Sequence, residues 1–83
     1  MTKVLVIEDD SLVSRTLLSH LKKRGFEVRG AENGEEGLAL FREFQPDLTL
    51  LDVKLPDING LDVLKQVKAE NKAATVIIMT AFD

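Results

Sequence analysis

The feature that most constrains the fold of this chain is a regular alternation of short apolar runs with amphipathic stretches. Continuously apolar or β-branched runs, typical of parallel strands buried on both faces, cover residues 3–7, 48–52 and 75–80. Residues 26–29 instead alternate apolar and charged side chains, which predicts a half-exposed edge strand. Helices are predicted between the strands, at about residues 11–24, 34–45 and 60–71. The order strand, helix, strand, continued to a fourth strand, predicts an open parallel α/β sheet with right-handed crossovers.

Each predicted helix carries an apolar stripe that we expect to face the sheet. The expected inward residues are Val13, Leu17, Leu18 and Leu21 in the first helix, Leu38, Phe41 and Phe44 in the second, and Leu61, Leu64 and Val67 or Val63 in the third. Ser11 or Asp10 can cap the first helix, and Gly25 follows its basic last turn. Asn33 and Gly34 are expected to start the second helix.

The composition restricts the function classes that are compatible with this chain. Its 83 residues fit one small soluble domain, and 11 basic against 14 acidic side chains give a net charge of -3. We therefore expect no direct binding to nucleic acid and no membrane role. The sequence has no cysteine for disulfides or thiolate metal sites, no apolar run of about 18 residues, and no visible signal peptide. The expected compartment is cytoplasmic.

Acidic residues follow two of the predicted buried strands directly. Glu8, Asp9 and Asp10 come after the first apolar run, and Asp52 ends the run at 48–52. Because open parallel sheets bind ligands beyond the carboxyl ends of their strands, we expect these carboxylates to meet in one crevice. Clustered carboxylates repel one another, and a divalent cation such as Mg2+ relieves that repulsion.

Two interpretations of these acids remain open from the spacing alone. In the first, they only cap helices and begin loops, where a negative charge is favoured by about 0.3 to 1 kcal/mol. In the second, Glu8 and Asp9 hold Mg2+, the ion bridges to Asp52, and Asp52 attacks a phosphorus atom. His20, the only histidine, is interpreted as a solvated helix residue without a chemical role.

The chain contains IEDDS after VLVI, then LTLLDVKLPDINGLDVL, and then VIIMTA. In this order and spacing the three segments resemble the receiver domain of two-component response regulators, and the nitrogen-regulation class is the most similar. The resemblance implies a flavodoxin-like open sheet with strand order 2-1-3-4. It also implies Mg2+ as cofactor, a histidine kinase as phosphodonor, and a phosphorylated switch rather than an enzyme with an external substrate.

The resemblance carries over to individual residues at the expected crevice. Asp52 matches the phosphoacceptor aspartate of the family. Glu8 and Asp9 match the acidic pair that binds Mg2+, with Asp9 expected as a direct ligand and Glu8 through water. Lys54 stands two residues after the acceptor, where the family supplies a backbone carbonyl to the metal.

The last apolar run also matches the family, but the resemblance then stops. Thr80 matches the hydroxyl residue that bonds a phosphoryl oxygen, and Ala81 matches the small residue that leaves room for it. A complete receiver continues with a fourth helix, a fifth strand and a fifth helix, which this sequence lacks. We therefore interpret residues 1–83 as a single, C-terminally truncated receiver domain with impaired phosphorylation. We expect a homodimer or higher oligomer through strand 75–80 and the uncovered sheet face.

Other function classes fit the sequence less well or make different demands on it. The main alternative is a self-assembling, dimeric or domain-swapped α/β fragment with a vestigial acidic pocket. A phosphatase-type hydrolase would prefer a second aspartate two residues after the nucleophile, where Lys54 stands. A flavin or nucleotide binder would need glycines and amide donors after the first strand, where this chain has carboxylates.

Overall fold

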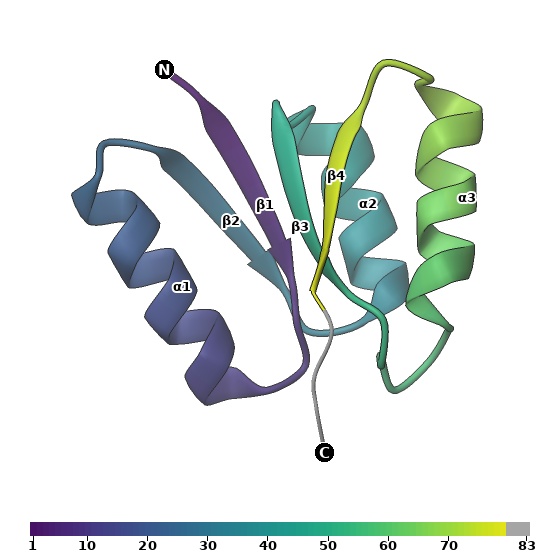
Figure 1. Ribbon diagram of the computed structural model, residues 1–83, viewed down its shortest axis with the longest axis horizontal. Helices are drawn as coiled ribbons and strands as arrows, with labels where there is room; N and C mark the ends of the chain where they lie inside the picture. Colours follow the sequence, from purple (N-terminus) through teal and green to yellow (C-terminus); the bar gives the residue numbers. More distant parts are fainter. Residues whose placement is uncertain (80–83) are drawn as a thin grey trace.

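The computed structural model describes residues 1–79, which form a parallel sheet with helices on both faces (Figure 1). In chain order the elements are β1 Lys3–Ile7, α1 Ser11–Lys23, β2 Glu27–Ala31, α2 Gly34–Phe44, β3 Leu48–Asp52, α3 Gly60–Glu70 and β4 Thr75–Met79. The strand order is β2-β1-β3-β4, and each neighbouring pair is parallel. The predicted fold class and strand order are thus confirmed, although β2 begins and ends later than residues 26–29. Thr80, predicted to end the last strand, lies outside the described residues.

The register of the two central strands brings their carboxyl ends together. Ile7 of β1 pairs with Leu51 of β3. Each of these residues is the last apolar residue before an acid, so Glu8 and Asp52 emerge at the same edge of the sheet. The chain crosses from β1 to β2 on one side and then to β3 on the other side of β1. The acids therefore lie where the strand order reverses, which is where open parallel sheets bind ligands.

The larger part of the core lies between the sheet and the pair formed by α2 and α3. Leu5, Ile7 and Leu51 point to this side and are fully buried. They pack in one cluster with Ala31, Leu38, Phe41, Phe44, Val63, Val67 and Ala74. The three inward residues predicted for α2 are all in this cluster, and each fully buried side chain of this size contributes about 1.5–3 kcal/mol. This packing fixes the strands whose ends carry the acids.

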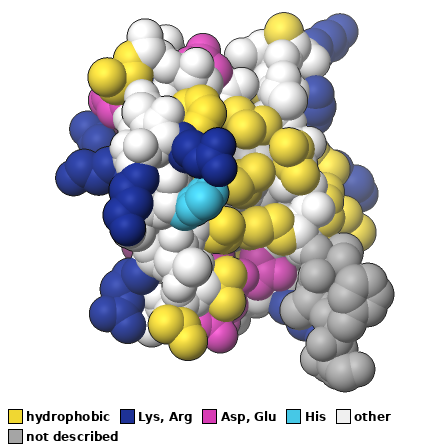
Figure 2. Space-filling view, turned by 60° about the vertical axis from the view of Figure 1, so that its left-hand side comes forward, with side chains coloured by type: hydrophobic (Ala, Val, Ile, Leu, Met, Phe, Trp, Pro, Cys, Tyr) yellow, Lys and Arg dark blue, Asp and Glu magenta, His cyan; other side chains and the backbone are white. Residues whose placement is uncertain are grey.

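The opposite face of the sheet is covered only in part by the described residues. There α1 contacts β1 and β2, while side chains of β3 and β4 on this side remain accessible. We call the surface formed by Leu48, Leu50, Ile77 and Met79 the open face, because Ile77 is 50% exposed and the other three are half-buried. Figure 2 shows hydrophobic side chains gathered on this part of the molecule, next to the histidine of α1.

Capping side chains and left-handed residues set the ends of the helices. Asp10, Asn33 and Asn59 are the N-caps of α1, α2 and α3, and each side chain accepts from first-turn backbone amides. Gly25 follows α1 with a φ of 92°, and Gln45 ends α2 with a φ of 50°. The glycine stop predicted for the first helix is thus confirmed. Among the described residues, no helix combines the length and the apolar character needed to cross a membrane.

Three of the four residues in the predicted apolar stripe of the first helix are half-buried, namely Leu17, Leu18 and Leu21, but the fourth does not face the sheet. Val13 is 39% exposed, whereas the neighbouring Ser14 is buried. The closest approach is to Gly30 of β2, where an added Cβ atom would lie 2.8 Å from Leu18 Cδ1 and 3.6 Å from Ser14 Oγ. Close packing of the helix on β2 therefore depends on two small residues, and the inward prediction for Val13 was wrong.

The third helix is also rotated relative to the predicted stripe. Leu61 was expected to face inward but is 48% exposed. Val63 and Val67 are buried, and Leu64 is partly buried against the core. Leu61 and Val63 are two positions apart, which places them on nearly opposite sides of a helix, so both cannot face the sheet. The helix ends at Glu70, one residue before the predicted end.

Candidate functional site

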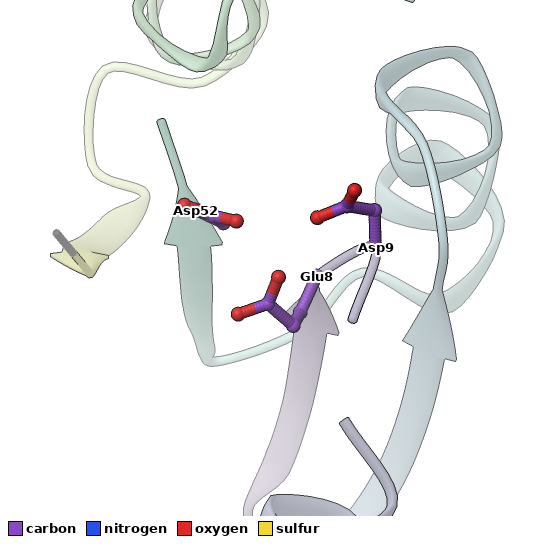
Figure 3. Close-up of side chains that lie close together, drawn as sticks. All are labelled: Glu8, Asp9 and Asp52. Atoms are coloured by element: carbon purple, nitrogen blue, oxygen red, sulfur yellow. The ribbon is translucent and has the colours of Figure 1, made fainter. Parts of the chain in front are cut away.

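Three carboxylates meet at the carboxyl ends of the two central strands. One oxygen each of Glu8, Asp9 and Asp52 lies within 4.8 Å of the others. Figure 3 shows Glu8 and Asp9 at the end of β1 and Asp52 at the end of β3, with their carboxylate groups facing a common space. The structure thus brings together the three acidic side chains that the sequence predicted as metal ligands.

Backbone interactions separate Asp10 from this cluster and hold Glu8 in it. The Glu8 amide donates to the Ala31 carbonyl at 3.0 Å, which extends the pairing of β1 with β2 by one residue. The Asp10 amide donates to Glu8 Oε2 at 3.2 Å. Asp10 Oδ1 accepts from the amides of Leu12 and Val13 at 2.9 and 3.2 Å. Asp10 is therefore committed to capping α1, and its two neighbours remain as candidate ligands.

The cluster has an unfavourable electrostatic balance in the metal-free protein. Glu8 and Asp52 are buried, with 8% and 6% of their surface exposed, while Asp9 is exposed. Burial, followed by the neighbouring Asp52 carboxyl group, raises the pKa of Glu8 to about 7. A cation in this space would reverse both effects, because it would favour the ionised form of every carboxylate around it.

The loop after β3 keeps the Asp52 strand end in a fixed conformation. The Lys54 amide donates to Asp52 Oδ1 at 3.2 Å, and the Gly60 amide donates to the Val53 carbonyl at 2.8 Å. A Cβ atom at Gly60 would lie 2.3 Å from the Asp52 carbonyl oxygen and 2.6 Å from Val53 Cα. The start of α3 is thus packed directly against the backbone that carries Asp52, and only glycine fits there.

The donor set fits a hard divalent cation such as Mg2+. All three side chains offer carboxylate oxygens, which Mg2+ prefers to nitrogen or sulfur ligands. A small number of protein ligands is enough for Mg2+, because the ion usually retains several bound water molecules. The exposed Asp9 leaves the cluster accessible to solvent, so an ion can enter without local unfolding. The chemistry and accessibility of the residues therefore agree with the metal predicted from the sequence.

The remaining predicted site residues are placed less completely. Lys54 lies at the start of the β3–α3 loop, two positions after Asp52, and its backbone amide is hydrogen-bonded to the Asp52 side chain. Thr80 and Ala81 lie outside the described residues. His20 is exposed on α1 and is not part of the acidic cluster, as expected for a solvated helix residue.

Asp57 is a residue of this region whose contacts the sequence did not predict. Its two carboxylate oxygens accept from the Gly34 and Glu35 amides at 2.7 and 2.9 Å. These bonds lower the pKa of the Asp57 carboxyl group, which is therefore ionised at neutral pH. The sequence does show an acid after Pro56 in a predicted loop, but its partners are more than 20 residues away. Spacing along the chain contains no signal for such a contact.

A comparison with protein-family models identifies one match that covers almost the whole chain. The model described as the response regulator receiver domain matches residues 4–83. The match includes the acidic cluster, the loop after β3 and the last strand.

Curated proteins with similar sequences include regulators of different size. The regulatory protein AtoC of Escherichia coli is 33% identical over 82 residues, which are 99% of this chain and 18% of AtoC. The protein PilH of Pseudomonas aeruginosa is 38% identical over 85 residues, covering 100% of this chain and 70% of PilH. The chain spans 18%, 21% and 34% of AtoC, a cyclic di-GMP phosphodiesterase of Thermotoga maritima and the probable transcriptional regulator TcrX of Mycobacterium tuberculosis.

Solved structures superpose on the full length of this chain. A CheY-like receiver domain protein from Methanospirillum hungatei gives a TM-score of 0.95 at 28% identity, covering 100% of this chain and 66% of that chain. The response regulator TrrA from Thermotoga maritima, solved in complex with Mg(2+)-BeF, gives 0.94 at 36% identity, covering 100% and 72%.

Proposed function

Because this chain belongs to the response regulator receiver domain family, we propose that it accepts a phosphoryl group on Asp52 from a histidine kinase with the help of Mg2+. Receiver domains are signalling switches of two-component systems rather than enzymes that turn over an external substrate. The observation that carries the proposal is the convergence of Glu8, Asp9 and Asp52 within 4.8 Å at the strand ends. The capping interpretation does not account for this convergence, because only Asp10 caps the adjoining helix.

Asp52 is proposed as the nucleophile. One of its carboxylate oxygens forms the bond to phosphorus, while the bond between phosphorus and the donor's imidazole nitrogen breaks and leaves its electron pair on that nitrogen. The Lys54 amide already donates to Asp52 Oδ1, which fixes the rotation of the carboxylate and leaves Oδ2 as the candidate attacking atom.

Glu8, Asp9, Asp52 and the Lys54 backbone carbonyl are proposed to hold the metal. Bound Mg2+ supplies positive charge that offsets the carboxylates and the phosphoryl oxygens. The raised pKa of Glu8 supports this arrangement, since a side chain with a pKa of about 7 is only about half ionised at neutral pH, and a bound cation would favour the ionised form. From the family resemblance we extend the proposal to Thr80, as the hydroxyl that bonds a phosphoryl oxygen, and to Ala81, as the small residue beside it.

An amide NMR titration tests this function. Mg2+ and then beryllofluoride, a phosphoryl mimic, are added to the chain and to Asp52→Asn, with Asp62→Asn as a control for the lost charge. We expect shifts around Asp9 and Asp52 in the wild-type chain and the control, and none with beryllofluoride in Asp52→Asn. A dispersed wild-type spectrum that responds to neither addition refutes the proposal.

A second proposal concerns assembly: two copies of this chain pair through β4 and the open face. β4 is an edge strand among the described residues, and edge strands present unpaired backbone groups to other chains. Ile77, at the centre of β4, exposes half of its surface beside the half-buried Leu50. A two-fold axis would place each open face against the other and cover both apolar surfaces.

Sedimentation equilibrium tests the assembly separately from the chemistry. Ile77→Lys should give a monomer at concentrations where the wild-type chain is a dimer. Leu61→Lys is the matched control, because Leu61 is 48% exposed against 50% for Ile77 but lies on α3, behind the other face of the sheet. A well-folded wild-type monomer at micromolar concentration rules out the assembly proposal and leaves the phosphoacceptor proposal intact.

A further inference from the structure

The β3–α3 loop is fixed at its tip by a carboxylate from the loop and the start of a different helix. Asp57 Oδ1 accepts from the Gly34 amide at 2.7 Å, and Oδ2 accepts from the Glu35 amide at 2.9 Å. Both amides belong to the first turn of α2, where backbone donors have no partner within the helix. Asn33, the N-cap of α2, satisfies only the Glu36 amide. Asp57 therefore completes the capping of α2 from a distant loop.

The next residue of the loop packs against the same helix start. A Cβ atom at Gly34 would lie 2.2 Å from Ile58 Cγ1 and 3.1 Å from Val63 Cγ2. Ile58 thus occupies the space that any other residue at position 34 would need for its side chain. The loop tip is held by two charge-assisted hydrogen bonds and by apolar contact at one point of α2.

The base of the loop connects this tip to the acidic cluster. Lys54 and Asn59 form an isolated antiparallel bridge, and the Gly60 amide donates to the Val53 carbonyl. Lys54 in turn donates its amide to Asp52. The loop is therefore a closed ring whose base carries Lys54 and whose tip carries Asp57. Only residues 55–58 lie between the bridged ends, and the pyrrolidine ring of Pro56 fixes its φ angle, so a displacement of the tip is transmitted to the base.

We propose that Asp57 is a positioning residue for the metal site, which holds the Lys54 carbonyl in place for Mg2+ by anchoring the loop tip to α2. This inference rests on the proposed function, since it requires that the acidic cluster binds Mg2+. The lowered pKa of Asp57 agrees with it, because the anchoring carboxylate is ionised wherever the site is able to bind a metal.

The first test compares the Mg2+ affinity of matched variants by amide NMR titration. Asp57→Ala should bind Mg2+ about tenfold more weakly, the lower end of the effects known for residues behind metal ligands. Asp57→Asn should bind Mg2+ with an intermediate affinity, because its single amide oxygen can replace only one of the two carboxylate oxygens that accept from Gly34 and Glu35. Asp62→Ala removes the same charge from a nearby exposed position and should bind like wild type. Thermal unfolding of each metal-free variant separates a loss of stability from a loss of affinity.

The second test uses the unmodified chain and is independent of whether Asp57→Ala folds. Coupling between two sites is reciprocal, so Mg2+ should protect the Asp57 contacts by the same factor that those contacts improve Mg2+ binding. Hydrogen exchange of the Gly34 and Glu35 amides should therefore slow about tenfold at saturating Mg2+, whereas exchange of the Asn71 amide at the far end of α3 should not change.

The outcomes distinguish this inference from the function on which it rests. If the wild-type chain does not bind Mg2+, both are wrong. If it binds, but Asp57→Ala binds equally well and exchange at Gly34 and Glu35 is unaffected, only the positioning role is wrong. If Asp57→Ala loses stability with unchanged affinity in its folded fraction, Asp57 is a helix cap and nothing more.

Discussion

Replacing Glu8 by glutamine should stabilise the metal-free chain at neutral pH, although it removes a residue of the candidate site. Burial and the neighbouring Asp52 raise the pKa of Glu8 from 4.5 to about 7 in the folded protein. The folded state thus holds this proton more tightly than the unfolded chain. The resulting stabilisation is complete below pH 4.5 and is lost as the pH rises through about 7. The shift corresponds to about 3 kcal/mol, and glutamine avoids this loss because it does not ionise.

Urea unfolding followed by far-UV circular dichroism measures the effect, since the chain has no tryptophan or tyrosine for fluorescence. With a chelator present, the stability difference between Glu8→Gln and wild type should increase between about pH 4 and about pH 8, by up to about 3 kcal/mol. Glu43→Gln, an exposed position on α2, provides the control. With excess Mg2+ the difference should shrink or reverse, because the metal stabilises only the folded chain that binds it. A difference that stays constant over this pH range refutes the assigned burial and coupling of Glu8.

Three further predictions concern the site and the core. Mg2+ affinity, measured by calorimetry, should increase from about pH 6 to about pH 8, because Glu8 must lose its proton to face the ion; an affinity independent of pH would contradict this. Leu51→Ala should destabilise the chain by about 2–5 kcal/mol in urea unfolding, whereas Leu61→Ala, at a half-exposed position, should change stability by less than about 0.5 kcal/mol. Gly60→Ala should cost about 1–3 kcal/mol and weaken Mg2+ binding, since its Cβ atom would press on the Asp52 carbonyl; unchanged binding would mean that the strand end tolerates displacement.

The sheet and its acidic edge could be predicted because both depend on local sequence signals. Continuous apolar runs mark strands that are covered on both faces, and β1 has four consecutive buried residues. The strand ends then meet through topology alone, so Glu8, Asp9 and Asp52 could be assigned to one cluster without knowledge of any side-chain contact. The strand order itself came from the family resemblance and not from periodicity.

The errors have a common physical cause, which is that hydropathy does not report how closely two elements approach. Ser14 is buried because Gly30 opposite it lets the helix come close, while the more apolar Val13 remains exposed. Leu61 and Val63 indicate two different rotations of α3, and hydropathy alone does not choose between them. The buried Val63 shows which rotation the helix adopts. The contacts of Asp57 depend on two segments that are distant in sequence, so no spacing rule predicts them.

The two halves of the acidic cluster are supported in different ways, and this difference determines where the site can be tuned. Glu8 follows Ile7, which is fully buried and so closely packed that a Cβ atom at Gly37 would lie 2.6 Å from its Cδ1 atom. The position of Glu8 at the end of β1 is therefore fixed by the packing of the core. Substitutions in that packing alter the stability of the whole fold. Lys54, by contrast, lies on a loop that is anchored at its tip by the exposed Asp57. Substitutions at the anchor should therefore move the proposed metal ligand Lys54 while the core stays intact, so we expect the loop half to be where metal affinity can change without loss of the fold.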